Sequence, residues 1–284
     1  MKKILVTGAT GFIGNYVVEK LLQLGYPVIA TSAHKTKAIE YNWFTKVVYI
    51  ECDLNNVDDN INYFVFFNKP DALIHLAWQG LPDYSESFHV RNNLPVHFTF
   101  LNNLISNGLK DITVAGTCLE YGLIEGCLRE NMDTNPAIPY AIAKNELREK
   151  LQKLPVRSFS LKWIRLFYMY GKGQNPNALF SQLDKALENG DPVFNMSGGE
   201  QVRDFLPVEK VADYITRIAL QDTLTGIINC CSGKPITIKE QVKNYLNERD
   251  KHIHLNLGYY PYTTYEPMNF WGDNSKLKSI LSND

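Results

Sequence analysis

Three glycines between an apolar run and an amphipathic segment constrain the fold of this chain more than any other feature. Gly8, Gly11 and Gly14 lie between the expected strand at 3–7, with its apolar centre at residues 4–6, and the first turn of the helix-period segment 12–24. In such a strand–turn–helix, the first glycine permits the tight turn, the second lets a pyrophosphate approach the backbone, and the third allows close contact between helix and strand. Unpaired amides at the helix start favour an anion. The pattern predicts a dinucleotide-binding loop, and the alternative is a tight turn without a ligand.

The rest of the first half alternates apolar runs with helix-period segments, which is typical of βαβ units in a parallel sheet. We therefore expect an α/β fold, a doubly wound Rossmann sheet with a smaller C-terminal substrate-binding lobe. Strands are expected at 3–7, 28–31, 47–50, 72–76, 112–115, 161–167 and 227–229, and helices at 12–24, 88–105, 141–154 and 208–220.

The domain organisation follows from where the texture of the sequence changes. Residues 1–170 are expected to form the dinucleotide-binding domain. After Gly171 the chain becomes rich in Gly, Asn and Pro, so residues 171–284 are expected to form mainly the substrate-binding lobe, with 204–230 returning to the first domain.

Composition excludes several classes of function. The chain of 284 residues has 29 Lys and Arg against 30 Asp and Glu, so it lacks the basic excess that a nucleic-acid partner requires. It has neither an apolar run of about 18 residues nor a signal-peptide pattern, and a cytoplasmic protein without membrane contact is expected. Its five cysteines lack CxxC spacing and nearby histidines, which predicts reduced thiols and no metal site.

The residues after the second expected strand bear on the choice of dinucleotide. A carboxylate there would bind the adenosine ribose of NAD and repel the 2′-phosphate of NADP. This chain has no acidic residue before Glu40, whereas Ser32, His34, Lys35 and Lys37 offer hydrogen bonds or positive charge. We therefore expect NADP (NADPH) as the cofactor in preference to NAD. The alternative is that these lysines form a solvated loop.

A tyrosine and a lysine share one face of the helix expected at 141–154. Tyr140 and Lys144 are four residues apart. A free phenol titrates near pH ~10, and a nearby ammonium together with a positively charged nicotinamide favours the phenolate. The pair is therefore a candidate catalytic acid and base, the alternative being a chance surface pair.

Together these motifs resemble the extended short-chain dehydrogenase/reductase family of the NAD-dependent epimerase/dehydratase type, over nearly the whole chain. TGATGFIG at 7–14 resembles its dinucleotide loop and YAIAK at 140–144 its catalytic pair; CDL at 52–54, HLA at 75–77 and Asn93 lie in matching order. The resemblance implies a set of cofactor contacts: Gly8, Thr10, Gly11, Phe12, Ile13, Gly14, Ser32, His34, Lys35, Asp53, Leu54, Leu76, Ala77, Trp78, Asn93, Tyr140 and Lys144.

In that family a Ser or Thr from a segment ending in Tyr-Gly binds the substrate oxygen. The segment here is GTCLEYG at 116–122, and matching back from its end places Thr117 at the hydroxyl position. The resemblance implies that Thr117 and Tyr140 share the carbonyl or alkoxide oxygen, that Tyr140 moves the proton, and that Lys144 lowers the pKa of Tyr140 while holding the nicotinamide ribose. The alternative for Thr117 is a hydroxyl that caps local backbone.

The resemblance also bears on the reaction. The family's 4,6-dehydratases have Asp and Glu after that hydroxyl residue, where this chain has Cys118 and Leu119. Its 4-epimerases retain NAD, whereas Ser32 and its basic neighbours fit a dissociable NADPH better. The expected function is therefore NADPH-dependent reduction of a nucleotide-linked 4-keto-6-deoxyhexose (dTDP-, CDP- or GDP-linked) for bacterial surface polysaccharide (O-antigen). A nucleotide-sugar 4-epimerase with retained NAD and a catalytically silent NADP-binding sensor remain alternatives.

Substrate contacts are expected from several segments. RDF at 203–205 resembles a family segment whose arginine pairs with the diphosphate of a nucleotide sugar, a role suited to the guanidinium of Arg203. The alternative is a salt bridge within the loop. A homodimer through 88–105 and 141–154 follows from the family habit. The expected substrate contacts are Gln79, Tyr84, Thr117, Cys118, Asn177 and Arg203.

Overall fold

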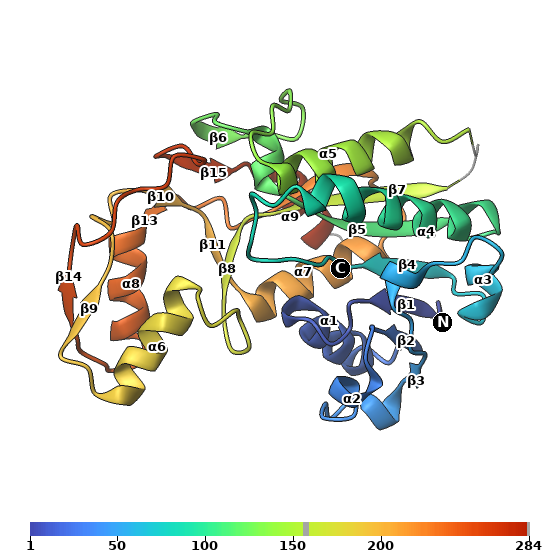
Figure 1. Cartoon of the computed structure of the whole chain (residues 1–284), viewed down its shortest axis with the longest axis horizontal. Helices are drawn as coiled ribbons and strands as arrows, with labels where there is room; N and C mark the ends of the chain where they lie inside the picture. Colours follow the sequence, from blue (N-terminus) through green and yellow to red (C-terminus); the bar gives the residue numbers. More distant parts are fainter. Residues whose placement is uncertain (156–158, 283–284) are drawn as a thin grey trace.

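The computed structural model describes residues 1–155 and 159–282. Within them, a seven-stranded parallel sheet forms the centre of the larger domain, with the strand order β12-β7-β5-β4-β1-β2-β3 (Figure 1). The strands of this sheet are β1 (Ile4–Thr7), β2 (Val28–Thr31), β3 (Val48–Tyr49), β4 (Ala72–His75), β5 (Asp111–Thr117), β7 (Ser160–Leu166) and β12 (Gly226–Cys230).

Helices cover both faces of the sheet because alternate strand residues point to opposite sides. Ile4 and Val6 pack into one apolar layer and Leu5 into the other. The first layer contains side chains of α1 (Phe12–Gln23), α7 (Val208–Leu220) and α9 (Ser275–Leu281); the second contains those of α3 (Tyr63–Phe66), α4 (Leu94–Ser106) and α5 (Pro139–Gln152). The predicted doubly wound α/β fold is confirmed.

The helix expected at 88–105 has a different start. Residues His89–Asn93 form a π-helical turn, and the α-helix α4 begins only at Leu94. Pro95 lacks a backbone N–H, so the α-helical hydrogen bond that residue 95 would otherwise donate four residues back cannot form. This turn places Asn93 near the edge of the sheet domain that carries the site.

The smaller lobe has its own apolar core. Phe180, Leu183, Phe194, Val242 and Tyr245 pack together in it. Its elements, visible at the left of Figure 1, are α6 (Leu179–Asn189), α8 (Ile238–Asn247), the antiparallel pair β10 (Val202–Arg203) and β13 (Ile236–Thr237), and the parallel pair β9 (Val193–Asn195) and β14 (His254–Asn256).

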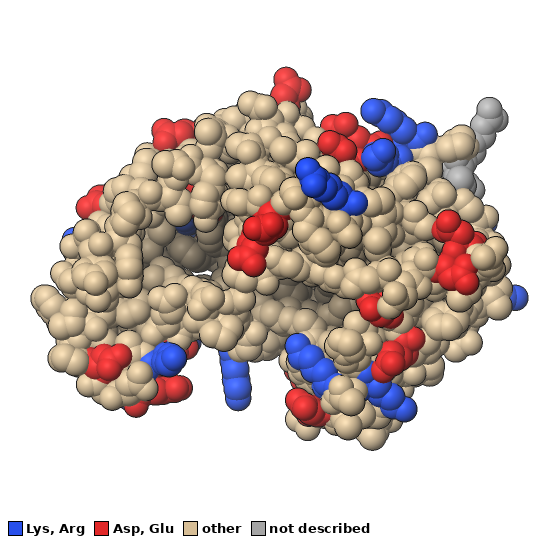
Figure 2. Space-filling view, in the orientation of Figure 1, with Lys and Arg blue, Asp and Glu red and all other residues tan. Residues whose placement is uncertain are grey.

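Two further strand pairs lie between the lobes, and Figure 2 shows a hollow between the smaller lobe and the sheet domain. The parallel pairs are β8 (Tyr168–Tyr170) with β11 (Phe205–Pro207), and β6 (Gly126–Leu128) with β15 (Phe270–Gly272). The chain returns to the larger domain twice: β12 pairs with β7, and α9 packs against α7 and β12. Sequence reasoning did not anticipate the return of α9.

No helix among the described residues is long and apolar enough to cross a membrane. The carboxyl ends of β1, β2, β4 and β5 meet at one edge of the sheet, where ligands bind in folds of this kind. The loops that follow these strands carry most of the candidate residues.

Candidate active site

The glycine loop joins β1 to α1 in a tightly packed turn. Gly8 has a φ of +69°, which favours glycine, and a Cβ there would lie 2.7 Å from the backbone nitrogen of Ala77. A Cβ on Gly14 would lie 2.1 Å from the carbonyl oxygen of Gly8. Helix α1 begins after Gly11 with no side chain capping its first amides. The loop therefore fits a dinucleotide pyrophosphate, which requires close backbone approach and free amides.

Other predicted cofactor residues surround this loop. The phenol of Tyr41 donates a hydrogen bond to the carbonyl oxygen of Thr10 (3.0 Å) and so supports the loop from outside. Asp53 precedes a 3₁₀ turn (Leu54–Asn56), and its carboxylate accepts hydrogen bonds from the backbone N–H and side chain of Asn55. The Asp53 carboxylate is thus held in place beside β3, with Leu54 buried behind it.

The loop after β2 has an acidic neighbour in the fold that its own sequence does not contain. The hydroxyl of Ser32 is hydrogen-bonded to the phenol of Tyr49 (2.8 Å), and the side chains of His34 and Lys35 are exposed. The backbone N–H of Lys35 donates to the carboxylate of Glu51 (2.6 Å), a residue from the segment that follows β3. A carboxylate is therefore present beside the loop where the sequence suggested only hydroxyl, imidazole and ammonium groups.

The three predicted catalytic residues meet at the end of β5. Tyr140 and Lys144 project from α5 and are almost fully buried, with 8% and 2% of their surfaces exposed. The Thr117 side chain lies within hydrogen-bonding reach of the Tyr140 phenol. The Thr117 hydroxyl oxygen also accepts a hydrogen bond from the backbone N–H of Leu119, as the capping alternative anticipated. Both roles are compatible, because a hydroxyl oxygen that accepts can still donate its proton.

Burial shifts the pKa values of Tyr140 and Lys144 away from their usual values. Removal from water raises the pKa of Tyr140 above its usual value, while the hydrogen bond from Thr117 acts in the opposite direction. Burial lowers the pKa of Lys144 to about 7, and the Glu120 carboxylate opposes this shift. The ammonium of Lys144 donates to the carbonyl oxygen of Ala115 (2.8 Å). In the free protein, Tyr140 therefore keeps its proton and is ready to donate it.

Aromatic side chains form the wall beside Tyr140 and Lys144. The ammonium of Lys144 lies 3.8 Å from the centre of the Trp78 ring, and the Tyr84 ring centre lies 5.3 Å from that of Tyr140. Trp78 donates from Nε1 to His89, and the Asn93 side chain donates to the carbonyl oxygen of Gln79. These contacts bring together the residues predicted from three separate segments.

Sequence reasoning missed the buried carboxylate beneath Thr117. Glu120 has no exposed surface and accepts hydrogen bonds from the backbone N–H of Thr117 (2.9 Å), the indole of Trp163 and the guanidinium of Arg165 (2.9 Å). A second guanidinium, that of Arg148, lies 4.0 Å away. Glu120 belongs to the same segment as Thr117. The signal that could have indicated its role is a carboxylate placed directly after a buried strand.

Two buried histidines lie behind the glycine loop. His75 Nδ1 is 2.8 Å from the hydroxyl of Thr7, and His75 Nε2 is 2.8 Å from Nδ1 of His97. Burial lowers the pKa of His75 to about 3, and burial together with the neighbouring His75 and Lys144 lowers the pKa of His97 as well. Both imidazoles are uncharged at neutral pH.

We expect the free energy of unfolding to fall as the pH is lowered from about 6.5 towards 3. The unfolded chain takes up protons on His75 and His97 in this window and the folded protein does not, so acid favours unfolding; above pH about 6.5 the pair contributes no pH dependence. Urea unfolding at several pH values measures this. In the variant His97→Gln, the free energy of unfolding should fall less steeply with decreasing pH than in the wild-type protein. The control His34→Gln, at an exposed position, should behave like the wild type. Equal slopes in all three proteins would contradict the prediction.

The predicted substrate residues are only partly assembled. Cys118 is buried beside Thr117, and Asn177 is exposed in the loop before α6. Arg203 is fully buried, pairs with Glu266 (2.9 Å), and lies with its guanidinium carbon 4.5 Å from the centre of the Phe270 ring. The sequence left open a salt bridge within the loop, but the observed partner, Glu266, comes from a segment 63 residues further along the chain. The Nε atom of Arg203 has no hydrogen-bond partner among the described residues.

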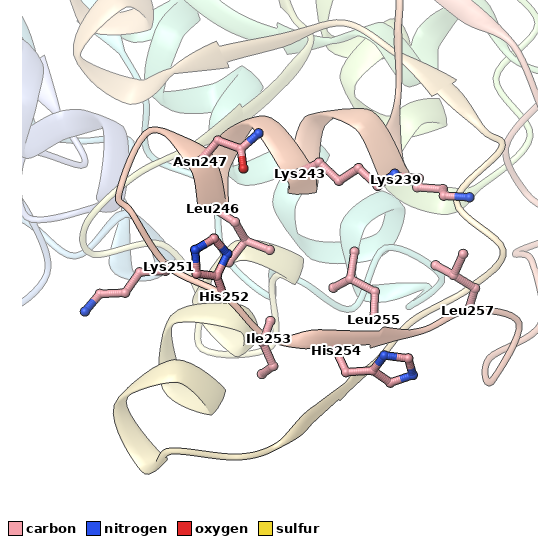
Figure 3. A pocket seen from close by; sticks show the side chains of 10 residues that line it. All are labelled: Lys239, Lys243, Leu246, Asn247, Lys251, His252, Ile253, His254, Leu255 and Leu257. Atoms are coloured by element: carbon pink, nitrogen blue, oxygen red, sulfur yellow. The ribbon is translucent and has the colours of Figure 1, made fainter.

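A basic groove on the smaller lobe is separate from this site. It lies between α8 and β14, has a volume of about 440 Å³, and contains none of the predicted site residues (Figure 3). Its charged and imidazole side chains are Lys239, Lys243, Lys251, His252 and His254. Figure 1 places α8 and β14 at the far left of the smaller lobe, whereas α5 lies over the sheet domain, so the groove does not contribute to the catalytic cluster.

The fold and the site define a class of protein: a Rossmann-type oxidoreductase with a Tyr–Lys pair at the end of a central strand. Residues 4–231 match the family model described as the NAD dependent epimerase/dehydratase family. The chain belongs to this family and is an enzyme that acts on CH–OH groups. Among the described residues there is no group of side chains suited to a metal ion, and the five cysteines are free.

Two curated proteins from Aggregatibacter actinomycetemcomitans are similar to the chain over almost their whole length. One, named dTDP-6-deoxy-L-talose 4-dehydrogenase (NAD(+)), is 31% identical over 272 residues, which is 95% of this chain and 98% of that protein. The other, named GDP-6-deoxy-D-talose 4-dehydrogenase, is 28% identical over 298 residues, which is 99% of this chain and 92% of that protein.

Solved structures show the same fold. The chain superposes on a UDP-glucose-4-epimerase from Stenotrophomonas maltophila with bound NAD at a TM-score of 0.86 and 18% identity, covering 99% of this chain and 93% of that one.

The prediction of NADP is wrong. The relative that is 31% identical is named as an NAD(+) enzyme, and the structural neighbour holds NAD. The physical reason lies in the loop after β2: the Ser32 hydroxyl is bonded to Tyr49, the basic side chains are exposed, and the Glu51 carboxylate is adjacent. A carboxylate supplied by the segment that follows the neighbouring strand β3 was not visible from the residues of β2 alone.

Proposed function

We propose that this enzyme interconverts a nucleotide-linked 6-deoxyhexose and its 4-keto form, using NAD(H). The buried cluster of Thr117, Tyr140 and Lys144 carries the proposal, because it provides a proton donor and a hydrogen-bond donor for a single substrate oxygen. The full-length similarity to a dTDP-6-deoxy-L-talose 4-dehydrogenase supports a dTDP-linked 6-deoxyhexose as the first substrate to test.

The side chains divide the chemistry at C4 between them. Hydride exchange with C4 is the step that NAD(H) supplies when bound. In the reductive direction, Thr117 donates a hydrogen bond to the carbonyl oxygen and Tyr140 gives that oxygen its proton, so that ketone, hydride and proton form the alcohol. In the oxidative direction Tyr140 receives the proton. Lys144, held by the carbonyl of Ala115, stabilises the phenolate that remains after the transfer.

The sugar and the diphosphate are assigned to the cleft between the lobes. Gln79, Tyr84 and Cys118 border the catalytic cluster and are proposed to contact the sugar. Arg203 and Asn177 are proposed to contact the diphosphate. For Arg203 this role requires Glu266 to give up its ion pair, because the guanidinium is enclosed in the free protein.

A nucleotide-sugar 4-epimerase is the second candidate. Relatives named UDP-glucose 4-epimerase, among them a protein of Halalkalibacterium halodurans that is 26% identical over 267 residues, favour it. The two functions differ in whether NAD(H) is consumed. A dehydrogenase changes the cofactor stoichiometrically, whereas an epimerase returns it to its starting state.

The test is to mix the purified enzyme with dTDP-, CDP- and GDP-linked 4-keto-6-deoxyhexoses and follow the absorbance of NADH. Stoichiometric oxidation of NADH with one of these sugars, and its reversal with the 6-deoxyhexose and NAD⁺, is expected. Interconversion of UDP-hexoses without net change in the cofactor would instead establish the epimerase. Binding of cofactor without turnover of any sugar would leave a catalytically silent binding protein.

Two wider roles belong to the same proposal. We propose that the product supplies a bacterial surface polysaccharide and that the enzyme is a homodimer formed through α4 and α5. The two helices are neighbours on one face of the sheet and can present a joint surface. Measurement of the mass in solution tests the dimer, and a monomeric mass would count against it.

A further inference from the structure

The segment after β3 brings a carboxylate to the end of β2. The backbone N–H of Cys52 donates to the carbonyl oxygen of Ser32 (3.1 Å), so the two segments run side by side beyond the strands. Next to this contact, the carboxylate of Glu51 accepts a hydrogen bond from the backbone N–H of Lys35 (2.6 Å). The end of the second strand is where a Rossmann fold holds the adenosine ribose of its dinucleotide.

The other polar groups at this position are engaged or exposed. The Ser32 hydroxyl is within hydrogen-bonding distance of the Tyr49 phenol, which also donates to the carbonyl oxygen of Ser32. The side chains of His34, Lys35 and Glu51 are all exposed to solvent, and of these the Glu51 carboxylate accepts a hydrogen bond from the backbone of the loop. Since β2 itself (VIAT) contains no acidic residue, Glu51 is the carboxylate that the structure fixes beside the residues following this strand.

We propose that Glu51 makes this enzyme selective for NAD: its carboxylate accepts hydrogen bonds from the adenosine ribose hydroxyls and repels the 2′-phosphate of NADP. From the segment after β3, Glu51 thus performs the role that an acidic residue at the end of β2 has in other dinucleotide-binding folds. A ribose hydroxyl is a donor that a carboxylate accepts well, whereas a phosphate beside it adds a second anion at short range. The inference rests on the proposed use of NAD(H).

The competing interpretation is that Glu51 only caps the short helix α2 (Lys35–Ala38). The two roles predict different measurements. A cap contributes to stability and leaves the preference between the two dinucleotides unchanged, because it does not contact the 2′ position of the adenosine ribose, where the two differ. If Glu51 selects the cofactor, its removal weakens the binding of NADH and strengthens the binding of NADPH, so the ratio of the two affinities changes.

The experiment measures dissociation constants of NADH and NADPH by fluorescence titration without any sugar. Wild-type protein is expected to bind NADH at least about tenfold more tightly, which corresponds to ~1.4 kcal/mol. In Glu51→Gln, NADH should bind more weakly, NADPH more tightly, and the ratio should fall at least about tenfold. The matched control is Glu40→Gln, an exposed acid in the same part of the sheet domain, which should leave the ratio unchanged. An unchanged ratio in Glu51→Gln would overturn the proposal.

Wild-type protein provides a second test that does not depend on the variant. Adenosine 5′-monophosphate should bind more tightly than adenosine 2′,5′-bisphosphate, and the difference should shrink as salt is added, because repulsion between exposed anions is screened. Equal binding, or a difference independent of salt, would contradict the role of Glu51. Selectivity for NADH without turnover of any sugar would contradict the proposed function and leave this inference standing.

Discussion

Replacement of Tyr140 by phenylalanine is expected to lower kcat for the interconversion of the 4-keto sugar and the 6-deoxysugar by between about 10² and 10⁴. The variant removes the phenol that lies against the Thr117 hydroxyl, and with it the group that carries the proton. Phenylalanine fills the same buried position beside Tyr84 and Trp78, so the fold and the cofactor loop are kept. Stopped-flow or steady-state NADH absorbance measures the loss.

The affinity for NADH should change far less than kcat in this variant. The matched control is Tyr26→Phe, which removes a phenol from the turn between α1 and β2. That variant should keep the wild-type kcat. Retention of most of the activity in Tyr140→Phe would show that another group transfers the proton.

The variant Glu120→Gln should destabilise the protein by about 3–5 kcal/mol. The amide keeps the size of the side chain but leaves the buried guanidinium of Arg165 without its counter-charge, and Arg148 loses one of its two neighbouring carboxylates, keeping only that of Glu149. The same substitution also affects the active site: it weakens the acceptor for the Thr117 amide and removes the charge that supports the Lys144 ammonium. A Glu120→Gln variant that still folds should therefore be less active than the wild-type enzyme.

Urea unfolding of wild-type and variant protein gives the difference in free energy. The control Glu188→Gln, at an exposed position near the end of α6, should change stability by less than about 0.5 kcal/mol. The double variant Glu120→Gln, Arg165→Met should recover part of the loss, because it removes the uncompensated guanidinium. A loss below about 1 kcal/mol in the single variant would contradict the role of Glu120 as the counter-charge of Arg165.

The sheet domain could be predicted because its signals are local. The apolar runs that form β1, β2 and β4 are each fully buried, and the glycine spacing requires a strand, a turn and a helix in that order. The start of α4 was misjudged, because the periodic apolar residues continue through the π turn at His89–Asn93 and only Pro95 marks the change. The return of α9 to the sheet domain could not be read from a short amphipathic segment.

In the candidate site, too, the residues linked by local spacing were predicted and those linked by long-range contacts were not. Tyr140 and Lys144 were found because four residues along a helix place two side chains on one face. Glu51 and Glu120 were missed, since each acts on residues that only the fold brings to it. Glu51 lies sixteen positions from Lys35 in the sequence, and Glu120 meets Arg165 across forty-five. Contacts at such separations depend on the order of the strands.

The sequence by itself determined the parallel sheet, the dinucleotide loop and the family of the enzyme, because all three depend on residues close together along the chain. Only the tertiary structure decided the surroundings of these motifs: the Glu51 carboxylate beside the loop after β2, the Glu120 network under Thr117, and the enclosure of Arg203 by Glu266. The reason is electrostatic. The preference for a cofactor and the ionisation of a buried group depend on every charge within a few ångströms, and those charges come from distant parts of the chain.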